Sequence, residues 1–121
     1  MRIYNRMVVG LMEEGRADRV FRALADSTRR DIVLRTLEAE HSVSALARDY
    51  PMSFAAVQKH VAVLEEAGLV TKRRRGREQL VRGDVDTVRR AARLLDALEA
   101  VWRGRAERMS EILAEPDGGT P

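Results

Sequence analysis

The stretch Met52–Val70 (MSFAAVQKHVAVLEEAGLV) constrains the fold of this 121-residue chain more than any other, because its apolar residues fall on one helical stripe. The residues at the i, i+4 and i+7 positions of this stripe are Val57, Val61 and Leu64. Ser53 precedes the first turn and can accept a hydrogen bond from its open N–H groups, so we expect it to be the N-cap. Gly68 then ends the helix. The pattern predicts one helix with a buried face.

The opposite face of this helix carries small, polar or basic side chains and no carboxylate. Its members are Ala55, Gln58, Lys59 and Ala62. Most exposed helix faces of this composition are only solvated surfaces, but this one is also suited to a DNA groove. The neighbouring segments decide between these two interpretations.

A shorter helix is expected just before this stretch. Ser42 and Val43 start it, and Pro51 closes it because proline cannot continue a helix. The connection Tyr50–Ser53 is short. Two short helices joined by such a turn predict a helix-turn-helix, with the second helix as the recognition helix.

Two further helices are expected nearer the N-terminus. The first spans Arg16–Ala25 and turns Val20, Phe21 and Leu24 inward. Asp26 and Ser27 then offer a cap for a second helix over residues 28–40. Its buried stripe is expected at Ile32, Val33 and Leu37, with Thr36 as a further candidate.

A basic hairpin is expected directly after the recognition helix. Leu69–Thr71 and Gln79–Arg82 are extended runs, and the polar sequence between them is centred on Gly76. Residues 71–83 hold six basic side chains against Glu78 alone, a balance of +5 in a chain whose net charge is +3. This concentration of positive charge indicates a polyanionic partner at that place. A helix-turn-helix followed by such a hairpin predicts a winged helix, whose wing reaches the phosphate backbone or the minor groove.

A long helix over residues 85–113 is expected to be the dimer interface. Its apolar residues recur every three or four positions, and those expected at the interface are Val88, Leu95, Leu98, Trp102, Met109 and Leu113. At ~1.5 Å per residue the helix is about 43 Å long, which is more than so small a domain can cover. A second copy of the chain is the expected cover. The alternative, a helix folded back on its own domain, would need a break at Gly104.

Length and composition fit one mainly α domain with a small β-hairpin, over residues 16–114. Residues 1–15 are expected to be an arm or an extra helix, and residues 115–121 a disordered tail. The chain has no cysteine, and its apolar run Met7–Met12 is too short for a signal peptide or a membrane span, so we expect a cytoplasmic protein. No nucleophile turn, phosphate-binding glycine loop or triad setting points to an enzyme.

Two separated motifs resemble the arsenic-repressor (ArsR) type of winged helix-turn-helix transcriptional regulators. Residues 20–32 (VFRALADSTRRDI) resemble the opening signature of that family, and residues 43–70, with KHVAVLEEAGLV at their end, resemble its helix-turn-helix. The resemblance covers about residues 16–114. It implies a homodimer that binds double-stranded operator DNA, usually to repress transcription.

The departures from this family pattern indicate its branch that does not sense metals. Metal-sensing members carry a cysteine motif on the helix before the turn, and residues 42–49 hold none. Other members bind zinc between their C-terminal helices through histidine and carboxylates, but the C-terminal helix of this chain has no histidine. Its Trp102–Arg103 pair instead matches the non-metal branch. No metal or cofactor is therefore expected, although Asp84 and Asp86 with residues of a partner remain an alternative zinc site. Whether a small effector binds is open.

The candidate DNA-binding residues lie on the recognition helix and the wing. They are Ser53, Ala55, Gln58, Lys59, His60, Lys72, Arg73, Arg74, Arg75 and Arg77. Gln58 can present its amide to adenine, and Lys59 can reach guanine or a phosphate. His60 borders the buried stripe, so packing or a phosphate contact is its expected role. In the family an arginine is common where this chain has Ala62. The alternative function is a winged-helix interaction module that binds an acidic protein or RNA.

Overall fold

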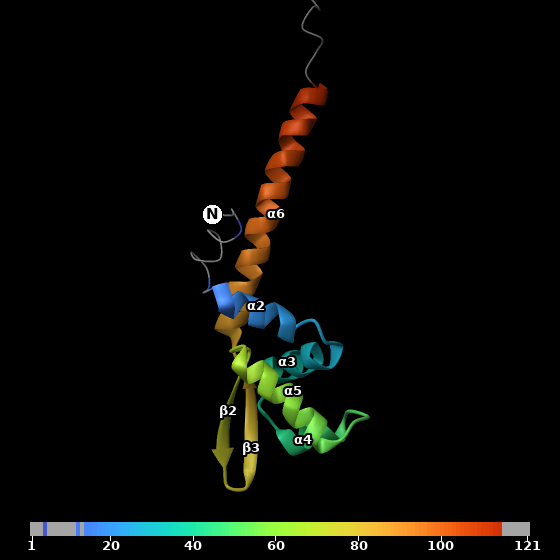
Figure 1. Ribbon diagram of the computed structural model, residues 1–121, viewed down its shortest axis with the longest axis vertical. Coiled ribbons are helices and arrows are strands. Elements are labelled where there is room, and N and C mark those ends of the chain that lie inside the picture. The colour runs from blue at the N-terminus through green and yellow to red at the C-terminus, as the bar shows by residue number, and fades with distance from the viewer. Residues whose placement is uncertain (1–3, 5–11, 13, 115–121) are drawn as a thin grey trace, which may run out of the picture.

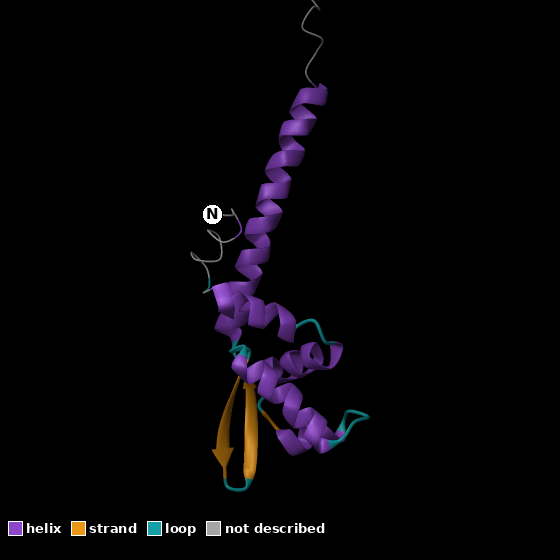
Figure 2. Cartoon of the chain, viewed as in Figure 1, coloured by secondary structure: helices purple, strands orange, loops and turns teal. Residues whose placement is uncertain are grey.

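The computed structural model describes Tyr4, Met12 and residues 14–114, and it is mainly helical with a small antiparallel sheet (Figures 1 and 2). In chain order the elements are α2 (Glu14–Ala23), α3 (Ser27–Glu38), β1 (His41–Ser42), α4 (Val43–Arg48), α5 (Phe54–Glu66), β2 (Val70–Arg75), β3 (Glu78–Gly83) and α6 (Val85–Ala114). The predicted fold class is confirmed. The predicted arm and tail lie almost wholly outside the described residues.

The predicted cap between α2 and α3 is confirmed. Asp26 is the N-cap of α3, and its Oδ2 accepts a hydrogen bond from the backbone N–H of Arg29 at 3.0 Å.

The expected burial of Leu37 was wrong, because Leu37 is 38% exposed whereas Thr36 is only 1% exposed. The Thr36 hydroxyl donates to the backbone carbonyls of Ile32 and Val33, so its burial leaves no polar group unpaired.

The helix-turn-helix consists of α4 and α5. Ser42 caps α4 by accepting from the backbone N–H of Ala45 at 3.0 Å, and Ser53 caps α5 by accepting from that of Ala56 at 3.1 Å. Val57, Val61 and Leu64 are buried, as the spacing predicted. The turn is tied to α3, because Arg35 donates to the Asp49 carboxylate at 2.6 Å. These contacts define the starts of α4 and α5 and join the end of α4 to α3.

The sheet has three strands in the order β1-β3-β2, all antiparallel. The sequence predicted only the two strands of the hairpin, and the third strand, β1, was missed. It pairs with β3 through only two residues, so it leaves little trace in the sequence. The wing strands are also longer than expected and leave a turn of two residues, Gly76 and Arg77. Gly76 has φ of +62°, so a side chain would be strained at this first turn position.

The core of the winged-helix domain is formed by apolar side chains from α2 to β3 and from the first turns of α6. Ile32, Leu46, Leu64, Val81 and Leu94 are among its fully buried members. Beyond the core, α6 projects away from the rest of the domain (Figure 1). Its 30 residues make a rod about 45 Å long at ~1.5 Å per residue. No helix in the described part of the chain combines the length and hydropathy that a membrane span needs.

Candidate nucleic-acid interface

The recognition helix α5 presents the expected face to solvent. Ala55, Gln58 and Lys59 are exposed, and Ala62 is half-buried on the same side. Sequence reasoning missed Phe54, which lies at the N-terminus of the helix with 46% of its surface exposed. In helix-turn-helix proteins the N-terminal residues of this helix reach the base edges, where an apolar side chain can contact a thymine methyl group. An exposed aromatic residue directly after an N-cap was the available signal.

His60 lies on the inner edge of α5 and contacts the start of α3. Its Nδ1 lies 3.3 Å from Nη1 of Arg29 and 3.9 Å from Oδ2 of Asp26. The same Arg29 also donates to the backbone carbonyls of Ala23 and Arg22, so its guanidinium connects three segments. The two sequence motifs therefore meet here, and the imidazole serves to seat α5 against α3. Arg29 was not predicted to have a role, because its partner is 31 residues away.

The wing strand β2 places alternate basic side chains on opposite faces of the sheet. Lys72 lies on the face that meets α5, where its Nζ is 3.3 Å from Oε1 of Glu65. Arg74 shares that face by alternation, and Arg73 and Arg75 lie on the other. The predicted basic hairpin is therefore two basic surfaces rather than one.

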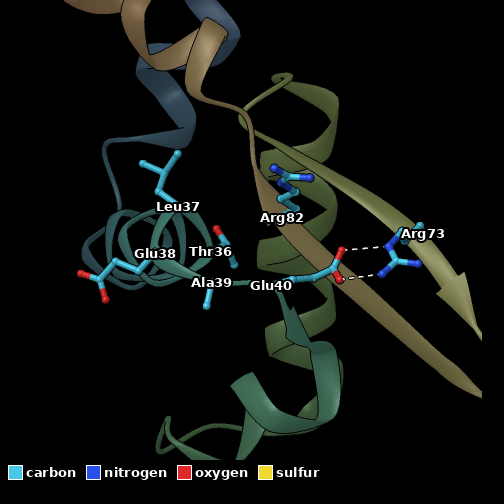
Figure 3. A pocket seen from close by; sticks show the side chains of 7 residues that line it. All are labelled: Thr36, Leu37, Glu38, Ala39, Glu40, Arg73 and Arg82. Atoms are coloured by element: carbon cyan, nitrogen blue, oxygen red, sulfur yellow. Dashed lines mark hydrogen bonds and ion pairs between the residues drawn. The ribbon is translucent and has the colours of Figure 1, made fainter.

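Arg73 is held by a carboxylate that sequence reasoning missed. Its Nε and Nη2 donate to the two carboxylate oxygens of Glu40 at 2.9 Å and 2.8 Å, as Figure 3 shows. The Arg73 guanidinium keeps the pKa of Glu40 below its ordinary value, with further attraction from Arg82 and Arg75. The same hydrogen bonds raise the pKa of Arg73. Because the partners are 33 residues apart, no local pattern could have revealed this pair.

The tip of the wing carries the remaining cations. Arg74, Arg75 and Arg77 are exposed, and within the described residues none of them forms an ion pair. Arg74 Nε donates to the backbone carbonyl of Gly76 at 3.3 Å, which steadies the turn. Figure 1 places this tip at the far end of the hairpin, beyond α5. Three exposed guanidinium groups with no ion pair among the described residues suit contacts with phosphate or with a narrow minor groove.

The apolar face of α6 is largely uncovered. Leu95, Leu98, Trp102, Met109 and Leu113 are exposed as expected, with Trp102 at 64%. Val101 and Ile112 were not predicted but are also exposed beside them. Val88 differs from the other predicted interface residues because it packs against the core of its own chain. The helix runs through Gly104 without a break, so the alternative of a folded-back helix was wrong.

The start of α6 is joined to the rest of the domain by polar contacts. Asp84 Oδ1 accepts hydrogen bonds from the backbone N–H groups of Asp86 at 3.0 Å and Thr87 at 3.2 Å, so its carboxylate serves the helix start. Arg16 Nη2 donates to the Thr87 hydroxyl at 3.0 Å. Among the described residues, no three side chains of the types His, Cys, Asp or Glu come together as metal ligands would.

Comparison with known proteins gives consistent matches. Residues 24–73 match a family described as a helix-turn-helix domain. The chain is 45% identical over 67 residues to the HTH-type transcriptional regulator Rv2034 of Mycobacterium tuberculosis, which is 55% of this chain and 63% of that protein. This chain thus spans less than two thirds of that relative.

Solved structures extend the similarity to the whole winged-helix domain. An ArsR-like transcriptional regulator from Rhodococcus sp. RHA1 is 34% identical, with a TM-score of 0.71 over 84% of this chain and 94% of that one. The homodimeric winged helix-turn-helix DNA-binding domain of a Mycobacterium bovis protein has a TM-score of 0.60 at 24% identity, over 82% and 88% of the two chains. The second match concerns the fold alone.

Proposed function

The chain belongs to the ArsR-type family of winged helix-turn-helix transcriptional regulators, and from this premise we propose that it is a homodimeric repressor of a pseudo-palindromic operator. The observation that carries the proposal is the position of α5 beside the basic wing. A face without carboxylates, formed by Ala55, Gln58 and Lys59, can enter the major groove while the wing tip reaches the backbone.

Division of labour between these two elements follows from their chemistry. Gln58 offers an amide that matches the N6 and N7 atoms of adenine, and Phe54 offers a ring to a thymine methyl group. Arg74, Arg75 and Arg77 offer charges that any duplex can satisfy. We therefore assign base selection to α5 and phosphate binding to the wing.

The proposed dimer forms through the exposed apolar face of α6. Large contiguous apolar surfaces on soluble proteins mark association sites, and here Leu95, Leu98 and Trp102 are exposed members of such a surface. The homodimeric state of the M. bovis domain with the same fold supports a second copy as the partner. The two-fold axis of such a dimer would relate the two recognition helices. Half-sites about 34 Å apart, one turn of DNA, are then expected.

Repression is the proposed outcome because it requires only occupancy of the operator. The described residues form one winged-helix domain with a projecting helix, and such a domain bound at an operator covers the DNA beneath it. Steric exclusion of polymerase from an overlapping promoter is sufficient.

Selection of bound fragments from genomic DNA tests the proposal directly. We expect enrichment of one inverted repeat, and we expect its affinity to fall by several orders of magnitude from roughly 50 to 200 mM salt. A reporter placed behind that sequence should be less active when the protein is present. Binding to single-stranded RNA or to an acidic protein without any preferred duplex would overturn the proposal in favour of an interaction module. Increased reporter activity would refute repression alone.

A further inference from the structure

One wing arginine is engaged inside the free protein. Arg73 and Glu40 form a two-pronged pair in which both carboxylate oxygens accept a guanidinium N–H, at 2.8 Å and 2.9 Å (Figure 3). Charge-assisted pairs of this geometry are stronger than single contacts, because the planar fork matches the two acceptors. Glu40 comes from the short connection between α3 and β1, so the pair links the wing to the body of the domain.

The surroundings of Glu40 are positively charged. Arg73, Arg75 and Arg82 all attract its carboxylate, and they lie on the same face of the sheet by strand alternation. A cavity of about 420 Å³ adjoins the pair, between the last turn of α3 and the wing. Glu40 thus occupies, among three guanidinium groups, a position where an external anion would otherwise be favoured.

A DNA phosphate and a carboxylate offer arginine the same kind of acceptor. Each presents two oxygens that a guanidinium can bind in a fork, and each carries the negative charge that the always-protonated arginine requires. Both therefore compete for the same donors, and Arg73 can satisfy only one of them fully.

We propose that Glu40 is an internal competitor of DNA phosphate, a latch that withholds Arg73 from polyanions and lowers the affinity of the wing. The biological meaning of the latch rests on the proposed function, since only a nucleic-acid-binding wing gains from it. Its effect is to weaken sequence-independent binding, which is dominated by phosphate contacts, and so to leave base contacts a larger share of the selection.

The latch responds to competing anions and not to mild acidification. The Arg73 guanidinium lowers the pKa of Glu40 below its ordinary value of 4.5, so the carboxylate stays charged throughout the neutral range. Protonation opens the latch only under strongly acidic conditions. Its physiological trigger is therefore the phosphate backbone itself.

The first test is Glu40→Gln, which keeps the size of the side chain and removes its charge. We expect roughly three- to tenfold tighter binding to a duplex of unrelated sequence, and a salt dependence of log K steeper by about 0.9, the value of one added phosphate contact. Glu38→Gln is the matched control, because Glu38 lines the same cavity and within the described residues forms no ion pair. Equal affinities for the two variants would overturn the latch.

The second test asks whether the effect passes through Arg73. In an Arg73→Ala background, Glu40→Gln should no longer tighten binding, whereas a general change in surface charge would tighten it as before and would refute the proposal. Circular dichroism of each variant checks that the fold persists.

Elution from heparin separates the latch from the proposed function. Glu40→Gln should elute at higher salt than Glu38→Gln even if no operator exists, since heparin is a polyanion without base sequence. Failure to bind duplex DNA by every variant, with this difference on heparin intact, would refute the proposed function and keep the latch. Identical elution of the two variants would refute the latch.

Discussion

The helices α5 and α6 both carry an apolar stripe at helical spacing, yet their stripes have different fates. In α5, Val57, Val61 and Leu64 are all buried within the chain. In α6 the burial stops after Leu94, and the stripe continues into solvent. The difference depends on how much chain is available to cover each helix. Helix α5 is enclosed by α2, α3, α4 and β2, whereas no other described element covers the distal part of α6 (Figure 1). Periodicity therefore predicts which side of a helix is buried but does not identify the covering surface.

The largest expected effect comes from adding a charge to the uncovered stripe. In the proposed α6 dimer, Leu98→Glu would bury two like charges near the two-fold axis, and an uncompensated buried charge costs about 3–5 kcal/mol. The dissociation constant of the dimer should therefore rise by between roughly a hundredfold and a few thousandfold. Sedimentation equilibrium measures this constant directly.

Ala100→Glu is the matched control for that charge. It adds the same carboxylate two residues away, about 200° around the helix, where the side chain points away from the stripe. This variant should remain dimeric. If Leu98→Glu sedimented as a folded dimer with unchanged operator affinity, α6 would not be the interface.

The second prediction concerns the covered stripe. Leu64→Ala should lower the free energy of unfolding by about 2–5 kcal/mol, because Leu64 is fully buried and its truncation leaves a cavity. This loss should be the same at low and high protein concentration. Leu113 is 81% exposed in the single chain, so Leu113→Ala should leave the stability of the monomer unchanged. It should lower stability only where the protein concentration is high enough for the proposed dimer to form. Urea unfolding at two concentrations distinguishes the two cases, and a concentration-dependent loss in Leu64→Ala would contradict the distinction.

Local sequence patterns were sufficient for most of the fold. The i, i+4 spacing located α5 and α6, and Asp26, Ser42 and Ser53 marked helix starts because their side chains can satisfy open N–H groups. The strand β1 was missed, since a pairing of two residues leaves no alternation to detect. The spacing placed Leu37 in the buried stripe, with Thr36 as a further candidate, but it is Thr36 that is buried. The Thr36 hydroxyl donates to carbonyl groups of its own helix, so the polar side chain can be buried there.

The candidate site was less accessible to sequence reasoning than the fold. Because the buried stripe of α5 was predicted correctly, the opposite side of the helix could be predicted to be exposed. Gln58 and Lys59 lie on that side. In the wing, charge alone treated all basic residues as equivalent. Their actual environments depend on Glu40 and Glu65, which lie in other elements and are brought close only by folding. Long-range ion pairs do not recur at a fixed spacing, so the sequence contains no pattern from which they could be predicted.

The third prediction tests the division of labour between α5 and the wing. Gln58→Ala should cost about 1–3 kcal/mol on the operator, and should cost little on unrelated duplexes, because a bidentate base contact is lost. Arg75→Ala should weaken binding to every duplex and lower the salt slope by about one. Competition titrations with operator and mutated operator duplexes measure both effects. An equal loss on all sequences for Gln58→Ala would remove α5 from base selection.

The smallest effect on stability is expected from removing the charge of Asp26, which lies beside the contact between α3 and α5. Asp26 caps α3 beside Arg29 and His60, and the backbone N–H of Arg29 holds the pKa of this carboxylate below its ordinary value of 3.8. A lowered pKa means that the ionised form stabilises the folded state, so the contribution is present above pH 3.8 and is lost as the pH falls through the folded-state value. Asp26→Asn should therefore be less stable than the native chain near neutral pH, and the two should converge in strong acid.

Asp18→Asn controls for the loss of one charge, since Asp18 is exposed on α2 and forms no ion pair within the described residues. Thermal unfolding between neutral and strongly acidic pH measures both variants against the native chain. The difference should shrink with acidity for Asp26→Asn only, because the Asp26 carboxylate loses its advantage once it is protonated in both states. By contrast, in the described chain the only ion pair of the distal part of α6 joins Arg103 to Glu99 on the same helix, so it does not hold α6 against another element. A difference in stability for Asp26→Asn that stayed constant with pH would mean that the charge of this carboxylate does not stabilise the folded state.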